Sequence, residues 1–92
     1  MTRLFKQIFG VKKPIIGALH FKPMPGFEGF ETKERILEAA KRDLFALESG
    51  GVNAIIVENN YDLPHKIKVE QETVAMMTFL TAELMKNSKL PF

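Results

Sequence analysis

Two short apolar stretches, PIIGALH at residues 14–20 and VNAIIVE at residues 52–58, determine the fold class of this chain. Both have the length of a strand and are rich in isoleucine and valine, and neither alternates regularly between apolar and polar residues. Strands without this alternation are typically buried on both faces, as in a parallel sheet covered by helices. The two stretches therefore predict parallel strands in an α/β fold.

Helical periodicity follows each of these stretches. In residues 32–49 the apolar side chains share one arc, Thr32 is suited to be the N-cap, and Gly50 comes directly after the end. Residues 70–86 predict a second helix, whose buried face is expected to hold Val74, Met77, Leu80, Thr81, Leu84 and Met85. The order β-α-β-α, with Leu90-Pro91-Phe92 approaching a third strand, is typical of right-handed parallel crossovers.

The composition describes a small globular unit without cysteine chemistry. The chain has 92 residues, of which 46% are hydrophobic and 26% charged, and it contains no cysteine. Disulfide scaffolds, thiolate metal sites and cysteine nucleophiles are therefore excluded. No apolar run approaches the roughly 20 residues that span a bilayer, so we expect a cytoplasmic protein.

Positive charge gathers at the beginning of the chain. Residues 1–22 contain five basic residues and no acidic one, whereas the whole chain has a net charge of only +2. Because this charge is local and the rest of the chain is net acidic, we expect no nucleic-acid partner. Residues 2–10 predict a short amphipathic helix. Residues 2–13 either touch an anionic membrane surface peripherally or form a lid on the domain, and two helical turns alone bind membranes weakly, which favours the lid.

Polar residues follow both predicted strands. His20 and Lys22 come at the end of the first strand, and Glu58, Asn59 and Asp62 come at the end of the second. In parallel α/β folds the functional groups collect at the carboxyl ends of the strands. We therefore expect His20, Glu58 and Asn59 as candidate catalytic residues of a small-molecule site, with Lys22 and Asp62 as candidate substrate-binding residues.

The sequence leaves the chemistry of the His20–Glu58 pair open. A carboxylate beside an imidazole suits acid–base catalysis near neutral pH, and the same side chains can ligate a divalent metal. Asn59 is suited to position a substrate hydroxyl or phosphate. Alternatively, His20 and Glu58 only hydrogen-bond each other and the neighbouring backbone. The sequence assigns no metal site and identifies no cofactor.

Four residues of the helices carry structural expectations. Asp43 falls inside the apolar arc of the first helix, so we expect it to be buried, hydrogen-bonded and remote from the strand ends. Phe45, Met76 and Phe79 lie on the outer sides of the helices, and we expect them to be exposed. Apolar side chains in such positions usually face a neighbouring helix or subunit.

The motifs at the strand ends resemble those of the BtpA/SgcQ family. HFKPMPG at residues 20–26 is followed by ESGGVNAIIVEN at residues 48–59, by DLP at residues 62–64 and by ETVAM at residues 72–76. The resemblance keeps these motifs in order and spans nearly the whole chain.

This resemblance implies a (β/α)8 TIM barrel. Residues 1–92 would then form its N-terminal portion, in which a short helix precedes the first two βα units. Such a barrel needs about 250 residues and eight strands. We therefore expect the chain to be an N-terminal fragment produced by truncation, a frameshift or a split gene, and to be inactive in isolation.

The resemblance also implies two classes of function. The family is named for a factor of photosystem I biogenesis, which implies membrane-complex subunits as partners and a location peripheral to the membrane. The alternative is a barrel enzyme that acts on a sugar, a nucleoside or a phosphorylated small metabolite. Intact relatives are expected to form homo-oligomers.

Overall fold

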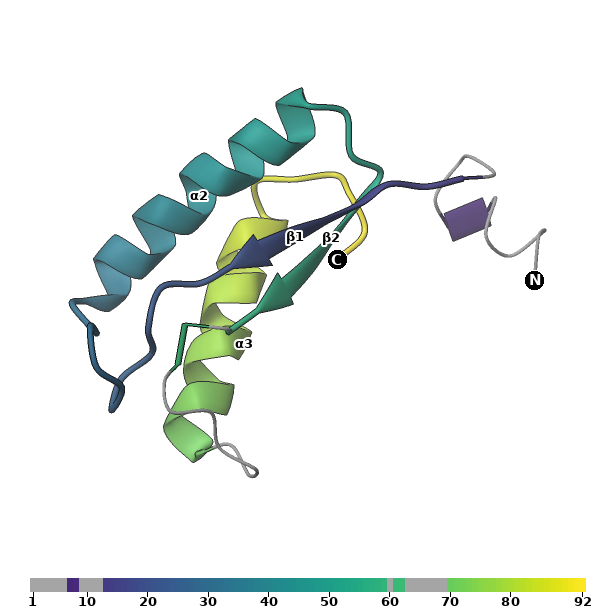
Figure 1. Ribbon diagram of the computed structural model, residues 1–92. Helices are drawn as coiled ribbons and strands as arrows, with labels where there is room; N and C mark the ends of the chain where they lie inside the picture. Colours follow the sequence, from purple (N-terminus) through teal and green to yellow (C-terminus); the bar gives the residue numbers. More distant parts are fainter. Residues whose placement is uncertain (1–6, 9–12, 60, 63–69) are drawn as a thin grey trace.

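The computed structural model describes residues 7–8, 13–59, 61–62 and 70–92 (Figure 1). Along the chain these form strand β1 (Ile16–His20), helix α2 (Lys33–Ser49), strand β2 (Ala54–Glu58) and helix α3 (Gln71–Met85). β1 and β2 form a two-stranded parallel sheet. The predicted α/β class and the parallel pairing are thus confirmed. The short helix predicted over residues 2–10 lies, apart from residues 7 and 8, outside the described residues.

The two faces of the sheet differ in burial. Leu19 and Ile55 are 1% and 2% exposed, and they share one hydrophobic core with buried residues of both α2 and α3. Both helices therefore cover the same face (Figure 1). On the other face Ile16 and Ile56 are 51% and 49% exposed. The sequence predicts strands that are buried on both faces, but the described part of the chain covers only one.

Helix α2 approaches β1 closely because Gly17 has no side chain. A Cβ atom at this position would lie 3.0 Å from Leu47 Cδ2 and 3.2 Å from Val52 Cγ1. Both distances are shorter than ordinary carbon–carbon contacts of about 3.5–4.0 Å. Gly17 therefore sets the distance between the strand and the helix that follows it.

The ends of α2 follow the rules of helix capping. Thr32 is the N-cap, and its Oγ1 accepts a hydrogen bond of 3.1 Å from the backbone N–H of Arg35. At the other end Gly50 N–H donates to Ala46 O, and Gly51 has a φ of 92°, a conformation that favours glycine. Between these ends the buried face holds Ile36, Ala40 and Leu44.

The buried face of α3 differs from the predicted one. Leu80 and Leu84 are fully buried, but Val74 and Met85 are 52% and 53% exposed. The residues that face the core are Thr73, Met76, Met77, Leu80 and Leu84. The expectation of an exposed Met76 was therefore wrong. Apolar residues surround most of this helix, so periodicity alone does not select the face that packs.

The segment after α3 returns to the sheet. Phe21 N–H donates to Glu58 O over 2.9 Å, so the backbone groups of Glu58 point towards β1. Because these groups alternate in direction along a strand, those of Ile56 and Ala54 also point towards β1. Ile55 N–H points to the opposite edge of β2, where it donates to Pro91 O over 2.8 Å. The hydroxyl of Ser88 also hydrogen-bonds the Glu48 carboxylate at the end of α2. One backbone hydrogen bond thus places Pro91 beside the edge of β2 that faces away from β1.

Candidate functional site

The carboxyl ends of β1 and β2 bring His20 and Glu58 together. The strand register makes these two residues direct partners. His20 Nδ1 lies 3.8 Å from Glu58 Oε2, and each side chain is 34% exposed. This distance fits an ion pair but is too long for a hydrogen bond. Among the described residues the buried His20 Nδ1 atom has no hydrogen-bond partner. The pair is therefore close together but is not locked by a hydrogen bond at Nδ1.

A hollow of about 260 Å³ adjoins His20 at the open edge of β1. Its lining residues are Ala18, His20, Asp43, Ala46, Leu47 and Tyr61. The Tyr61 ring meets the His20 ring edge-on, with the ring centroids 6.1 Å apart. His20 therefore adjoins this hollow together with the ring of Tyr61 and the carboxylate of Asp43.

The position of Asp43 corrects the expectation from the sequence. Asp43 is exposed and lines the hollow beside His20, instead of being buried far from the strand ends. Its neighbours on the helical wheel are apolar, but its side chain lies at the margin of the packed face, where solvent hydrates the charge. Tyr61 was also missed as a neighbour of His20. The only sequence signal for Tyr61 is its place in the loop that follows the second strand.

A second group of predicted site residues forms around Asp62. This carboxylate is 2% exposed. Its Oδ1 accepts a hydrogen bond of 2.7 Å from Met24 N–H, and its Oδ2 accepts one of 2.9 Å from Asn59 Nδ2. Asp62 N–H donates in turn to Asn59 O over 3.1 Å. Asp62 therefore connects the loop after β1 with the loop after β2, and both of its carboxylate oxygens accept bonds from the protein.

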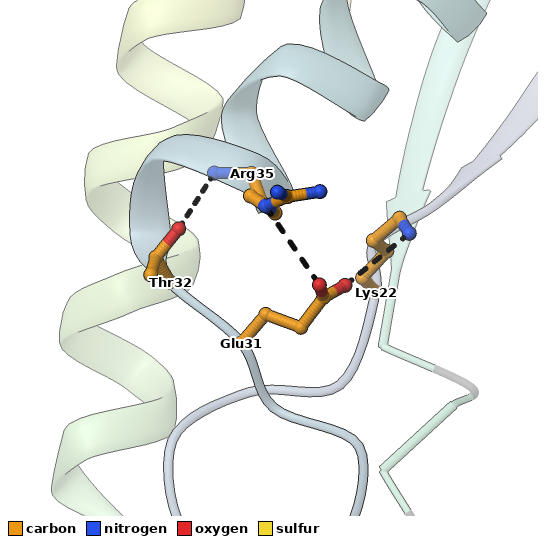
Figure 2. A network of polar contacts seen from close by, with 4 residues as sticks. All are labelled: Lys22, Glu31, Thr32 and Arg35. Carbon is orange, nitrogen blue, oxygen red and sulfur yellow. Dashed lines mark hydrogen bonds and ion pairs between the residues drawn. The ribbon is translucent and has the colours of Figure 1, made fainter.

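Lys22 belongs to a separate cluster at the start of α2. Figure 2 shows Lys22 and Arg35 on either side of the Glu31 carboxylate, next to the Thr32 cap. Lys22 Nζ lies 3.6 Å from Glu31 Oε1, and Arg35 Nε lies 3.8 Å from Glu31 Oε2. Two cations therefore share one carboxylate here, and the positive charge of Lys22 is partly balanced.

The structure thus divides the five predicted site residues into three places. His20 pairs with Glu58, Asn59 bonds to Asp62, and Lys22 pairs with Glu31. Within the described ranges no group of three His, Asp, Glu or Cys side chains is arranged to hold a metal ion. The roles assigned to these residues from the sequence stay predictions.

The sequence of this chain is similar to those of several known proteins. The family model described as "BtpA family" matches residues 11–92. The chain is 33% identical over 90 residues to the putative sgc region protein SgcQ of Escherichia coli K12. The aligned region covers 95% of this chain and 34% of that protein. It is 35% identical over 77 residues to an uncharacterised protein of Archaeoglobus fulgidus, covering 84% of this chain and 31% of that protein.

A third relative comes from Synechocystis. The photosystem I biogenesis protein BtpA of this organism is 35% identical over 80 residues, which cover 85% of this chain and 28% of that protein. The chain thus spans about a third of the length of these curated relatives. No solved structure matches the chain significantly. In the part of the chain that the structure describes, no helix is both long and apolar enough to cross a membrane.

Proposed function

Because this chain belongs to the BtpA family, we propose that it forms the first two βα units of a (β/α)8 barrel enzyme that acts on a sugar, a nucleoside or a phosphorylated small metabolite. The pairing of His20 with Glu58 at the carboxyl ends of adjacent parallel strands carries this proposal. In barrel enzymes the catalytic groups come from this end of the strands. The length of the relatives, about three times that of this chain, leaves room for the remaining strands.

In this proposal His20 and Glu58 act as one acid–base unit. If the His20 proton sits on Nδ1, facing Glu58 Oε2 at 3.8 Å, then Nε2 is left with a lone pair that can accept a proton from the substrate. The negative charge of the carboxylate then stabilises the imidazolium that forms. Partial exposure of both side chains gives a substrate access to the pair.

A chimeric protein tests this function in a complete chain. Residues 11–92 replace the matching third of the E. coli relative, and turnover is followed with ribose 5-phosphate, uridine and inosine as probes. We expect His20→Ala and Glu58→Gln to lower turnover by about 10²-fold or more, the usual contribution of a general acid–base group. Lys41→Ala on α2 serves as the control. Unchanged turnover in both variants, or no turnover of any probe, would contradict the proposal.

Two observations favour a second function, a role in the assembly of a membrane complex. The Synechocystis relative is named as a photosystem I biogenesis protein, and residues 1–22 of this chain carry five basic residues without an acidic one. We propose for this case that residues 2–13 contact membrane-complex subunits or the membrane surface from the cytoplasmic side. Apart from residues 7, 8 and 13, this segment lies outside the described residues.

Flotation with anionic liposomes separates the two functions. The assembly role predicts an association that weakens as salt rises and is lost when residues 2–10 are deleted, because exposed charges are screened by salt. Neutral liposomes provide the control. An absence of salt-sensitive association with the full chain would contradict the contact with the membrane surface and leave the enzyme proposal unaffected.

A further inference from the structure

Asn59 is held in one orientation by the buried carboxylate behind it. We propose that Asp62 is a positioning residue that makes Asn59 a hydrogen-bond acceptor, and that this part of the site binds the hydroxyl groups of a sugar-like ligand and not a phosphate group. This inference rests on the proposed function, because it specifies which part of a small metabolite the strand ends contact.

The first step is the pair of hydrogen-bond donors that face Asp62. Its Oδ1 faces the backbone N–H of Met24 at 2.7 Å and its Oδ2 faces Asn59 Nδ2 at 2.9 Å. A backbone N–H can only donate, so Oδ1 must accept. The two donors together compensate the charge of a carboxylate that is only 2% exposed, as a buried charge requires. Asp62 therefore accepts a hydrogen bond on each of its two carboxylate oxygens.

The second step is the orientation of the Asn59 amide. Asn59 Nδ2 donates to Asp62 Oδ2 over 2.9 Å, so the amide turns its NH2 group towards Asp62. The amide oxygen Oδ1 then lies on the opposite side of the planar group. Asn59 is partly exposed, and within the described ranges its Oδ1 has no hydrogen-bond partner. Asn59 thus offers a ligand an acceptor in a fixed position.

The third step is the charge around Asn59. The adjacent residue Glu58 adds a carboxylate, which faces His20 Nδ1 at 3.8 Å. Lys22, the nearest cation in the sequence after β1, is paired with Glu31 at 3.6 Å, and Arg35 shares that carboxylate (Figure 2). Acceptors bind hydroxyl donors and repel the anionic oxygens of phosphate. The described part of the strand ends is therefore matched to hydroxyl groups.

The substitution Asp62→Asn should make Asn59 present a hydrogen-bond donor to the ligand in place of an acceptor. Met24 N–H still needs an acceptor, so the new amide gives its oxygen to Met24 and turns its NH2 towards Asn59. Asn59 must then flip, so that its oxygen faces position 62 and its NH2 faces the ligand. We follow the Asn59 side-chain amide of the 92-residue chain by NMR and titrate it with D-ribose and with inorganic phosphate.

In the unsubstituted chain one Nδ2 proton of Asn59 should be shifted downfield by its bond to the carboxylate, and ribose but not phosphate should shift the resonances of Asn59 and His20. In Asp62→Asn the downfield shift should disappear and ribose binding should weaken about tenfold, the effect of losing one hydrogen bond. Glu83→Gln, which removes a carboxylate on α3, is the control. It should change neither the downfield shift of the Asn59 proton nor the affinity for ribose.

A second variant covers the case in which Asp62→Asn does not fold. Asn59→Ala removes the acceptor at a partly exposed position, and it should weaken the ribose response of His20 by a similar factor. The inference is overturned if phosphate shifts the Asn59 amide, if ribose leaves it unshifted, or if Asn59→Ala binds ribose as before. These results are distinct from failure of the proposed function, which is judged by turnover in the His20 and Glu58 variants.

Discussion

His20 and Glu58 are register partners at the carboxyl ends of two parallel strands, with Nδ1 and Oε2 3.8 Å apart. The arrangement follows from the order of strands and helices along the sequence. Two adjacent apolar strands joined by a helical crossover run parallel. The polar residues that end the two strands then lie side by side at the carboxyl end of the sheet. Further predictions follow from the packing that holds this edge in place.

Gly17→Val should destabilise the chain by about 1–3 kcal/mol, the usual effect of overpacking. The reason is the 3.0 Å separation between a Cβ atom at position 17 and Leu47 Cδ2. The midpoint and slope of urea unfolding measure the change. Ala18→Val, on the exposed side of the same strand, is the control. Equal midpoints for the two variants would show that α2 does not depend on Gly17 for its approach to β1.

Asp62→Ala should cost about 1–3 kcal/mol, because it leaves the Met24 N–H without its acceptor. The loss arises from the connection between the two loops, so it is expected without any ligand present. Thermal unfolding monitored by circular dichroism measures it. Asp43→Ala removes an exposed carboxylate from α2 and should stay within about 0.5 kcal/mol of the parent chain. A Tm for Asp62→Ala equal to that of Asp43→Ala would argue against a connecting role for Asp62.

Leu84→Ala and Met85→Ala test which face of α3 packs. Leu84 is fully buried, so its truncation should destabilise the chain by about 2–5 kcal/mol. Met85 is 53% exposed, and the same truncation there should have a much smaller effect. Urea unfolding of both variants gives the comparison. Similar losses for the two would favour the face predicted from periodicity, on which both residues lie.

Thr32→Ala should lower stability by about 1 kcal/mol through loss of the N-cap of α2. The hydroxyl of Thr32 accepts the Arg35 N–H at 3.1 Å. The matched control is Thr78→Ala. The exposed Thr78 hydroxyl donates to Val74 O one turn earlier in the same helix, α3. A drop in Tm for Thr78→Ala as large as that for Thr32→Ala would indicate that capping is not the cause.

The sequence predicted the parts of the fold that depend on local pattern. The strand–helix order, the cap at Thr32 and the juxtaposition of His20 with Glu58 all follow from apolar runs, spacing and strand direction. The packing face of α3 did not follow, because a helix with apolar residues on most of its surface has several faces that can be buried.

The candidate site was predictable only in part for a related reason. Asp62 was predicted to bind substrate, yet its carboxylate accepts bonds from a backbone N–H 38 residues earlier in the chain and from Asn59. Asp43 was predicted to be buried and lies exposed beside His20. Contacts of this kind depend on where two loops or a helix margin meet in space, and no local pattern specifies them.

The most direct test of the account is a double-mutant cycle on turnover in the chimeric barrel, with His20→Ala, Glu58→Gln and the double variant. If the two residues form one acid–base unit, each single substitution removes most of the activity and the double variant is scarcely worse than the His20 variant, because groups that act as a unit are not additive. Losses that multiply, or activity that survives the double substitution, would contradict the account.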